Sequence, residues 1–300
     1  MKLSVVLPCY NDEKTIKPCL ESLQKQTLTR KEYEIIVADD GSTDSTLEIA
    51  RKFKHLRILA SRHFGRSANR NRGWKAARAG IVFFAESDAV YSENFLKECL
   101  SFFKDWNVGG VIGKLEAWNL ESAWVKCRAA ELNSRFEGSY KPFTAWMFRK
   151  KVLQELGGFD VGLEIGEDAD LGKRVLGKDW KIAYARKAVW KHFEPPAILK
   201  VWKRFWLRGR EMPKYYKKNG FPKKVLFLDA AAFATVPLGF FYSPLWLVFA
   251  AFALVQVLMR ISYFGKIRKK YWPHLLFYLF STMIVSKLAR LYGLFREELK

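Results

Sequence analysis

Three short stretches of the sequence place carboxylates close together. They are ADDGS with Asp39 and Asp40, AESDA with Glu86 and Asp88, and GEDAD with Glu167 and Asp168. A buried carboxylate costs free energy unless a partner or a metal ion compensates it, and hard divalent cations prefer oxygen ligands. For Asp39 and Asp40 the alternative is a solvated turn, in which Asp and Ser cap the next helix and Gly41 supplies a permissive backbone. The predicted secondary structure around each stretch bears on this choice.

The first part of the chain alternates short apolar runs with helical patterns. We expect strands at residues 3–7, 34–38, 57–60 and 81–85, and helices at residues 15–26, 45–53 and 67–79. This alternation predicts an α/β fold with a mostly parallel sheet flanked by helices on both faces. Such sheets bind ligands beyond the carboxyl ends of their strands. The PCYNDE, ADDGS and AESDA stretches all follow such ends, so acidic residues gather at one rim of the sheet, which argues against the solvated turn.

The chain of 300 residues is strongly basic, with a net charge of +22 and a pI near 9.8. This charge suits nucleic acid, an anionic membrane surface or phosphate-rich small molecules as partners. The cysteines show no C-x-x-C spacing and predict reduced thiols of a cytosolic compartment, not a disulfide frame or a zinc site. No G-x-G-x-x-G follows the first strand, which argues against a nicotinamide-dependent dehydrogenase.

The composition changes in the last third of the chain. Residues 189–224 interleave aromatic residues with Lys and Arg, and residues 225–259 are mostly apolar, with Asp229 as their only charged side chain. A bilayer span needs roughly 20 apolar residues, so this run predicts two slightly short spans. A third apolar segment, residues 273–286, can span or lie flat. Basic clusters at residues 214–224 and 260–270 flank the pair of spans and predict, by the positive-inside rule, that both ends lie in the cytoplasm.

Four longer motifs occur in order along the chain. They are SVVLPCYNDEKTIKPCLESLQKQT, EIIVADDGSTDST, GRSANRNRGWKAARAGIVFFAESDA, and FRKKVLQELGGFD followed by GEDADLGKRV. Together they resemble the family-2 glycosyltransferases of the GT-A fold, over about two-thirds of the chain, from residue 3 to residue 209. The resemblance implies a GT-A catalytic domain at residues 1–195, a basic amphipathic interface segment at residues 196–224, and membrane helices at residues 225–300.

The resemblance also implies a nucleotide-diphosphate sugar as donor, with Mg²⁺ or Mn²⁺ bridging the diphosphate. The ESD stretch resembles the D-x-D signature of the family, with Glu86 in its first position. We assign the metal to Asp88 and expect Glu86, with its longer side chain, and Ser87 to contact the sugar donor. His192 in VWKHFEPP is the second candidate metal ligand, because relatives carry a His there that approaches the metal or diphosphate, and its alternative is a structural role.

In the family the DDGS segment receives the nucleoside. Asp39 or Asp40 would then be a buried acceptor that only the bound sugar donor satisfies. In the family, residues at and just after the first strand contact the base and the ribose. The residues of this chain that resemble them are Pro8, Tyr10 and Glu13. In RNRG, which follows the Arg-Asn-x-Gly pattern of the family, Arg70 is expected to contact the sugar donor through a charge-assisted hydrogen bond. The alternative is a helix-surface arginine without a ligand.

Glu167 and Asp168 are predicted to open a helix, where the helix dipole favours their ionised forms. In the family the Asp of this pair is the general base, so the resemblance places Asp168, with Glu167 beside it, in the catalytic site. Proton transfer by a positioned carboxylate contributes a rate factor of about 10²–10⁴. Attack from the face opposite the diphosphate inverts the anomeric carbon. Helix capping by these acids is the alternative.

These expectations combine into a multi-pass protein of the cell membrane with its catalytic domain on the cytoplasmic side. It would be a metal-dependent inverting glycosyltransferase whose partners are a nucleotide-sugar donor, a lipid-linked or glycan acceptor and membrane lipids. The first alternative is a polyprenyl (dolichyl) phosphate sugar synthase. A polyprenyl phosphate is already anionic and needs no base, so Asp168 favours a hydroxyl acceptor.

The segment KRFWLRGR occupies the place where processive synthases carry Gln-x-x-Arg-Trp, which is absent. We expect an amphipathic interface helix there, in which Arg204 or Arg208 is a candidate contact to the diphosphate. A basic membrane- or nucleic-acid-binding protein without catalysis is the alternative from another class. Because the basic residues lie beside apolar runs, anionic lipid is favoured over nucleic acid as their partner.

Overall fold

The computed structural model describes residues 1–136, 146–220 and 267–298, together with residues 142, 144, 251, 254, 255, 258 and 265. Contacts within the chain divide it into two units. The first unit is Met1–Trp118 with Phe136–Phe193, and the second is Asn119–Arg135 with Glu194–Lys300. The two membrane spans expected within residues 225–259 lie outside the continuously described ranges.

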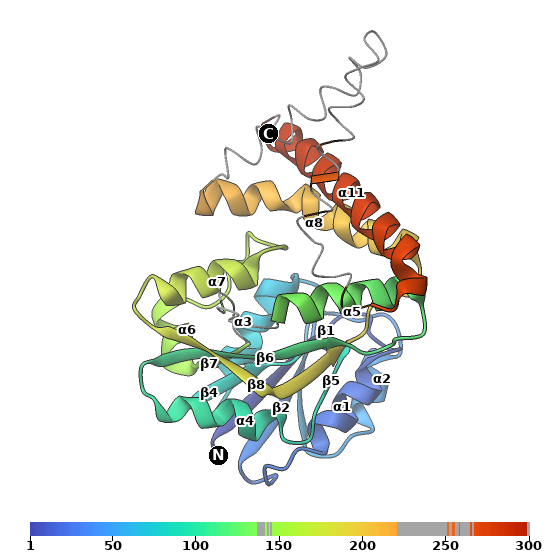
Figure 1. Cartoon of the computed structure of the whole chain (residues 1–300). Coiled ribbons are helices and arrows are strands. Elements are labelled where there is room, and N and C mark those ends of the chain that lie inside the picture. Colours follow the sequence, from blue (N-terminus) through green and yellow to red (C-terminus); the bar gives the residue numbers. More distant parts are fainter. Residues whose placement is uncertain are drawn as a thin grey trace. The chain divides into compact units, whose positions relative to one another are not determined.

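The first unit contains an eight-stranded sheet with the strand order β3-β2-β1-β4-β7-β6-β8-β5 (Figure 1). The strands are β1 (Leu3–Cys9), β2 (Tyr33–Asp39), β3 (Leu56–Ala60), β4 (Ile81–Phe84), β5 (Ala89–Tyr91), β6 (Val108–Ala117), β7 (Met147–Arg149) and β8 (Lys181–His192). Strands β1 to β4 run parallel, which confirms the α/β class predicted from the sequence. The pairs β4–β7, β6–β7 and β5–β8 are antiparallel, so the sheet as a whole is mixed.

Helices cover both faces of this sheet because successive strand residues point to opposite sides. In β1, Val5 and Leu7 belong to one buried apolar cluster and Val6 belongs to the other. The first cluster is covered by α1 (Ile16–Gln24), α2 (Thr46–Arg51) and α4 (Phe95–Ser101). The second cluster is covered by α3 (Arg66–Ala76), α6 (Lys150–Leu156) and α7 (Glu167–Leu176). Each fully buried large apolar side chain contributes about 1.5–3 kcal/mol.

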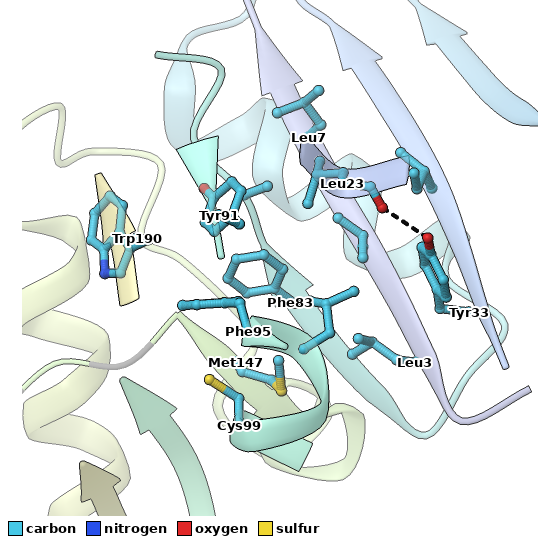
Figure 2. Close-up of a cluster of buried hydrophobic side chains, with 14 of the residues drawn as sticks. Leu3, Leu7, Leu23, Tyr33, Phe83, Tyr91, Phe95, Cys99, Met147 and Trp190 are labelled. Atoms are coloured by element: carbon cyan, nitrogen blue, oxygen red, sulfur yellow. Dashed lines mark hydrogen bonds between the residues drawn. The ribbon is translucent and has the colours of Figure 1, made fainter. Parts of the chain in front are cut away.

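The first cluster contains a group of aromatic rings (Figure 2). The rings of Phe83, Tyr91 and Phe95 lie 5.0–5.3 Å apart between centroids. At the other end of the cluster the Tyr33 hydroxyl donates a hydrogen bond to the carbonyl of Leu23 at 2.8 Å (Figure 2). Tyr91 lies two residues after the AESDA stretch, so this packing fixes the end of β4 and the turn that follows it.

The glycine of the RNRG motif brings α3 close to the sheet. A Cβ at Gly73 would collide with Cγ1 of Val6 in β1. The same helix carries Arg70 one turn earlier. The glycine therefore sets the distance between α3 and β1 and, with it, the depth at which Arg70 enters the second buried cluster.

The second unit is helical where the structure describes it. Its elements are α5 (Ala123–Phe136, of which residues 123–135 belong to this unit), α8 (Ile198–Asn219), a short 3-10 helix η3 (Lys269–Tyr271) and α11 (Trp272–Glu298). Helices α8 and α11 pack closely, because a Cβ at Gly209 would lie 2.5 Å from the carbonyl oxygen of Ser286. Helix α8 occupies the predicted amphipathic segment. Among the described residues, one stretch, Lys269–Leu294, is long and apolar enough to cross a membrane by length and composition.

Candidate active site

The loops after β1, β2 and β4 meet at the carboxyl ends of these strands, as the sequence predicted. The N–H of Asn11 donates to the Ser42 hydroxyl oxygen at 3.0 Å, and the Asn11 side-chain oxygen accepts from the N–H of Thr43 at 2.8 Å. Asn11 adopts a left-handed backbone with φ 55°, a conformation that Asn tolerates better than most residues. The Ser87 hydroxyl donates to Asp12 Oδ2 at 2.6 Å. Residues up to 75 positions apart in sequence thus form one rim.

Asp39 and Asp40 are buried, and hydrogen bonds from the chain itself satisfy both. The Asp39 carboxylate accepts from the N–H groups of Gly41 and Ser42, each at 3.1 Å. The Asp40 carboxylate accepts from the N–H groups of Phe64 and Gly65 at 2.9 and 3.0 Å. The expectation that only a bound sugar donor satisfies one of them is therefore wrong. A carboxylate offers about four acceptor positions. The Ser42 hydroxyl and the Cys9 thiol also donate to Asp39, so Asp40 retains more capacity for a ligand than Asp39 does.

The DDGS turn lies against the loop that leads into α3. Gly41 has φ 81°, and a Cβ on it would lie 2.9 Å from the backbone nitrogen of His63. His63 Nδ1 lies 2.9 Å from Asp40 Oδ2. The His63 ring also contacts the ring of Tyr10, with 4.3 Å between centroids, and both side chains are exposed. His63 is not recognisable from the sequence, because nothing in its local pattern distinguishes it from a surface histidine.

Two other residues expected to contact the nucleoside take part in local structure. Pro8 lies within β1 and pairs with Ala38 of β2. Glu13 is exposed, and its Oε2 accepts a hydrogen bond at 3.2 Å from the N–H of Ser45, the residue that precedes α2. Both residues lie at the rim, but Pro8 takes part in strand pairing and Glu13 caps the start of α2.

Glu86, Asp88 and His192 form the group of side chains best suited to hold a metal ion among the residues that the structure describes. Their candidate ligand atoms all lie within 4.8 Å of one another. His192 Nε2 is 3.0 Å from Asp88 Oδ2 and 3.8 Å from Glu86 Oε2. Two carboxylates and one imidazole fit Mn²⁺, and the carboxylates also suit Mg²⁺. Glu86, which sequence analysis assigned to the sugar donor, thus belongs to the candidate metal group by position.

Backbone pairing brings His192 to the ESD turn. Strand β5 pairs antiparallel with β8 in a register that places Ala89 opposite His192. The N–H of Phe193 donates to the carbonyl of Asp88 at 2.8 Å, which continues the pairing by one residue. Because the pairing of β5 with β8 fixes the backbone on both sides, the side chains of Asp88 and His192 are held within contact distance.

Three hydrogen bonds hold the ESD turn in place, through Tyr91, Cys19 and Asp12. The Tyr91 hydroxyl oxygen accepts the N–H of Glu86 at 2.8 Å, and the Cys19 thiol donates to the Glu86 carbonyl at 3.3 Å. The buried Ser87 donates its hydroxyl to Asp12, so its predicted contact with the sugar donor competes with a bond already made. Asp12 lies in the same PCYNDE stretch as Tyr10, but its role is not recognisable from the sequence, because its partner Ser87 is 75 residues away.

The acids of this rim are crowded. Burial raises the pKa of the Glu86 carboxyl; the charge of His192 opposes this, Asp88 adds to it, and Arg70 and Arg66 oppose it. Burial also raises the pKa of Asp12, against the hydrogen bond from Ser87. A divalent cation next to these carboxylates would favour their ionised forms. The electrostatics of the rim therefore fit a bound cation.

Comparison with known proteins identifies the family. The sequence profile of Glycosyl transferase family 2 matches residues 4–157, and that of Glycosyl transferase family group 2 matches residues 81–289. The chain belongs to glycosyl transferase family 2. It is therefore a glycosyltransferase by family membership, as the four motifs predicted.

Among curated relatives, the glycosyltransferase GlyA of Streptococcus pneumoniae is 28% identical over 234 residues, 69% of this chain and 33% of GlyA. The poly(ribitol-phosphate) beta-N-acetylglucosaminyltransferase TarS of Staphylococcus aureus is 35% identical over 166 residues, 52% of this chain and 29% of TarS. The family-2 glycosyltransferase chain described here thus spans about a third of the length of these two relatives.

Solved structures share its fold. The mannosyltransferase PcManGT of Pyrobaculum calidifontis, in complex with GDP-Man and Mn²⁺, superposes with a TM-score of 0.64 at 18% identity, over 95% of this chain and 86% of PcManGT. Residues 1–349 of S. aureus TarS in complex with UDP give a TM-score of 0.54 at 20% identity, over 99% and 92% of the two chains. These likenesses confirm the GT-A fold.

The remaining predicted residues of this glycosyltransferase lie on α7, α3 and α8. The helix begins at Glu167, as predicted, after Gly166 with φ 84°. Glu167 is buried and accepts a hydrogen bond from Arg70 Nη1 at 2.6 Å, whereas Asp168 is half-buried in the same first turn. Arg70 is therefore buried and paired, not a helix-surface arginine. In the second unit, Arg204 pairs with Glu194 at 2.5 Å.

Proposed function

We propose that this family-2 glycosyltransferase moves a sugar from a nucleotide-diphosphate sugar to a hydroxyl group, with inversion at the anomeric carbon and with Mg²⁺ or Mn²⁺. The observation that carries the proposal is the cluster of Glu86, Asp88 and His192 at the end of β4. PcManGT with GDP-Man and Mn²⁺ and TarS with UDP support a nucleotide-bound donor, and the former also supports a metal.

In this proposal the two sides of the rim bind different parts of the sugar donor. The exposed rings of Tyr10 and His63 offer a surface on which a nucleobase stacks, and Asp39 and Asp40 accept from the nucleoside. The diphosphate lies toward Asp88. A cation held there supplies neutralisation of the negative charge that grows on the leaving diphosphate.

Asp168 performs the proton transfer in this proposal. Its carboxylate accepts the proton of the acceptor hydroxyl while the hydroxyl oxygen forms a bond to the anomeric carbon. The bond from that carbon to the diphosphate oxygen breaks, and its electron pair leaves with the nucleoside diphosphate. The position of Asp168 in the first turn of α7 supports this role, because the positive end of the helix dipole favours the ionised carboxylate.

The acceptor in this proposal is a hydroxyl of a lipid-linked glycan or of a phosphate-containing glycan polymer. TarS is named as a poly(ribitol-phosphate) transferase, which supports a polyhydroxylated, anionic acceptor. The net charge of +22 also favours an anionic partner. A base such as Asp168 is needed for a hydroxyl acceptor and not for a polyprenyl phosphate.

We also propose that residues 225–300 attach the protein to the cell membrane, with the domain of residues 1–195 at the cytoplasmic face. The apolar stretch Lys269–Leu294 and the basic residues around it support attachment. Extraction of the full chain from cell membranes tests this proposal. Release by detergent but not by high salt is expected, and release by salt alone would contradict it.

The substitution Asp168→Asn tests the enzymatic proposal. Release of UDP or GDP and product formation would be followed with a panel of nucleotide sugars and Mn²⁺. Transfer should fall at least about a hundredfold because the amide cannot take the proton. Binding of nucleotide and metal should persist. Turnover close to that of the unmodified chain would remove Asp168 from the mechanism.

A further inference from the structure

A buried ion pair joins α3 to the start of α7. Arg70 Nη1 lies 2.6 Å from Glu167 Oε1, and the two side chains are only 4% and 5% exposed. Removing two charges from water costs free energy, and their attraction offsets this cost only when the two groups lie close together and are hydrogen-bonded. The residue after Glu167 is Asp168, which the proposed function makes the general base.

The surroundings of Arg70 allow its head group few alternative positions. Its guanidinium carbon lies 4.8 Å from the ring centroid of Trp146 and 5.3 Å from that of Phe159. Its Nε is buried and has no hydrogen-bond partner among the residues that the structure describes, so the pair with Glu167 is its principal polar contact with an acid there. Arg66, one turn earlier, lies 3.8 Å from Glu167 Oε1, but its side chain is 57% exposed.

Two neighbours of Arg70 hold the loop that leads into α7. The Ser67 hydroxyl donates to the carbonyl of Leu163 at 2.9 Å. The Asn71 side chain exchanges two hydrogen bonds with the backbone of Phe159, at 2.7 and 2.9 Å. These contacts fix backbone atoms before the helix. Of Ser67, Arg70 and Asn71, only Arg70 contacts a charged side chain in the first turn of α7.

We propose that Arg70 is a positioning residue that acts through Glu167 on Asp168. By fixing Glu167, it orients the first turn of α7, which also carries Asp168. This inference rests on the proposed function, because Asp168 must be the base. It replaces the expectation that Arg70 contacts the sugar donor directly, since a side chain that is 4% exposed and bound to Glu167 has little surface to offer a ligand.

The substitution Arg70→Met tests the proposal, with Lys75→Met as the matched control because Lys75 is an exposed cation on the same helix. In Arg70→Met, kcat should fall at least tenfold while KM for the nucleotide sugar and Kd for UDP or GDP with Mn²⁺ stay within about twofold. Arg70→Lys should recover part of kcat. A tenfold rise in KM and Kd with unchanged kcat would show direct contact with the sugar donor and overturn the proposal.

A second variant separates the effect on rate from an effect on folding. Arg70→Met leaves Glu167 buried without its partner, whereas Arg70→Met/Glu167→Gln removes both charges and is easier to fold. The double variant should show native circular dichroism and remain at least tenfold slow. Return of the full rate in the double variant would overturn the proposal.

A third measurement does not depend on transfer. Amide hydrogen exchange of residues 166–170 should be at least tenfold faster in Arg70→Met than in Lys75→Met, because the first turn of α7 loses its anchor. Equal exchange in the two variants overturns the positioning role. Failure of the unmodified chain to release nucleotide from any nucleotide sugar, with the exchange difference intact, would instead overturn the proposed function.

Discussion

Two acidic pairs lie on the same rim of the sheet and meet different conditions. Asp39 and Asp40, at the end of β2, accept hydrogen bonds from backbone N–H groups of the chain itself. Glu86 and Asp88, at the end of β4, face each other and His192, with side chains 23% and 35% exposed. Asp39 and Asp40 hold the DDGS turn against the loop before α3. Glu86 and Asp88 place two carboxylates close together in a partly exposed site.

This difference shows that acidity at a strand end has two distinct uses. Backbone amides fix the carboxylates of the DDGS turn, so that turn is built before any ligand arrives. The raised pKa of Glu86, caused mainly by burial, marks a position where the chain alone does not fully stabilise the ionised form. The comparison therefore assigns stability chiefly to one pair and chemistry chiefly to the other.

The largest expected effect is on activity at the second pair. Asp88→Asn should lower transfer at least about a hundredfold and abolish Mn²⁺ binding, because a candidate metal oxygen is replaced by an amide. Because Asp88 is partly exposed, the melting temperature should change by less than about 2 °C. Activity with titrated Mn²⁺ after chelation and calorimetry measure the two quantities. Full activity in Asp88→Asn would contradict a role of Asp88 in metal binding and catalysis.

The next effect is on stability at the first pair. Asp40→Asn weakens the acceptors of two backbone N–H groups and should cost about 1–3 kcal/mol of unfolding free energy. Urea denaturation measures this loss. Glu48→Gln is the control, since the Glu48 side chain is 69% exposed and its pair with Lys52 is a surface pair. Equal stability of the two variants would show that Asp40 is not a structural acid.

The smallest effect concerns pH. The pKa of Asp12 in the folded chain is raised by burial above its ordinary value of 3.8. On raising the pH, the unfolded chain loses this proton first, so the contribution of Asp12 to stability falls from about pH 3.8 until the folded pKa is passed. The difference in unfolding free energy between Asp12→Asn and the unmodified chain should change in this window. A constant difference from pH 4 to 7 would contradict the assignment.

The sequence predicted the parts of the fold that local patterns encode. Short apolar runs between helical patterns located β1 to β4, and the polar residues after them located the acidic rim. Strand β8 and its pairing with β5 escaped prediction, because Ala89 and His192 meet across a hundred residues of chain and no local period records that contact. The sequence motif flagged His192 only through family resemblance.

The candidate site was predictable in composition but less so in contacts. Asp88 and Asp168 were proposed because the ESD stretch and the Glu-Asp pair at a predicted helix start resemble motifs of the family. The pairing of Arg70 with Glu167 was not, since a surface and a buried arginine look alike in a basic helix that also carries Arg66 and Arg72. Packing depth, set here by Gly73 against Val6, decides between them and is a tertiary property.

The register of β5 against β8 has an evolutionary consequence. Neighbouring strand residues point to opposite faces, so one residue inserted or deleted between Val189 and His192, after the irregularity in the pairing of β8 with β6, would replace the imidazole opposite Asp88 with the side chain of an adjacent position. Lys191 precedes His192, and an ammonium group in that place would repel a cation. Descendants of this gene that keep the chemistry should therefore vary freely in loop length yet preserve the number of residues from Val189 to His192.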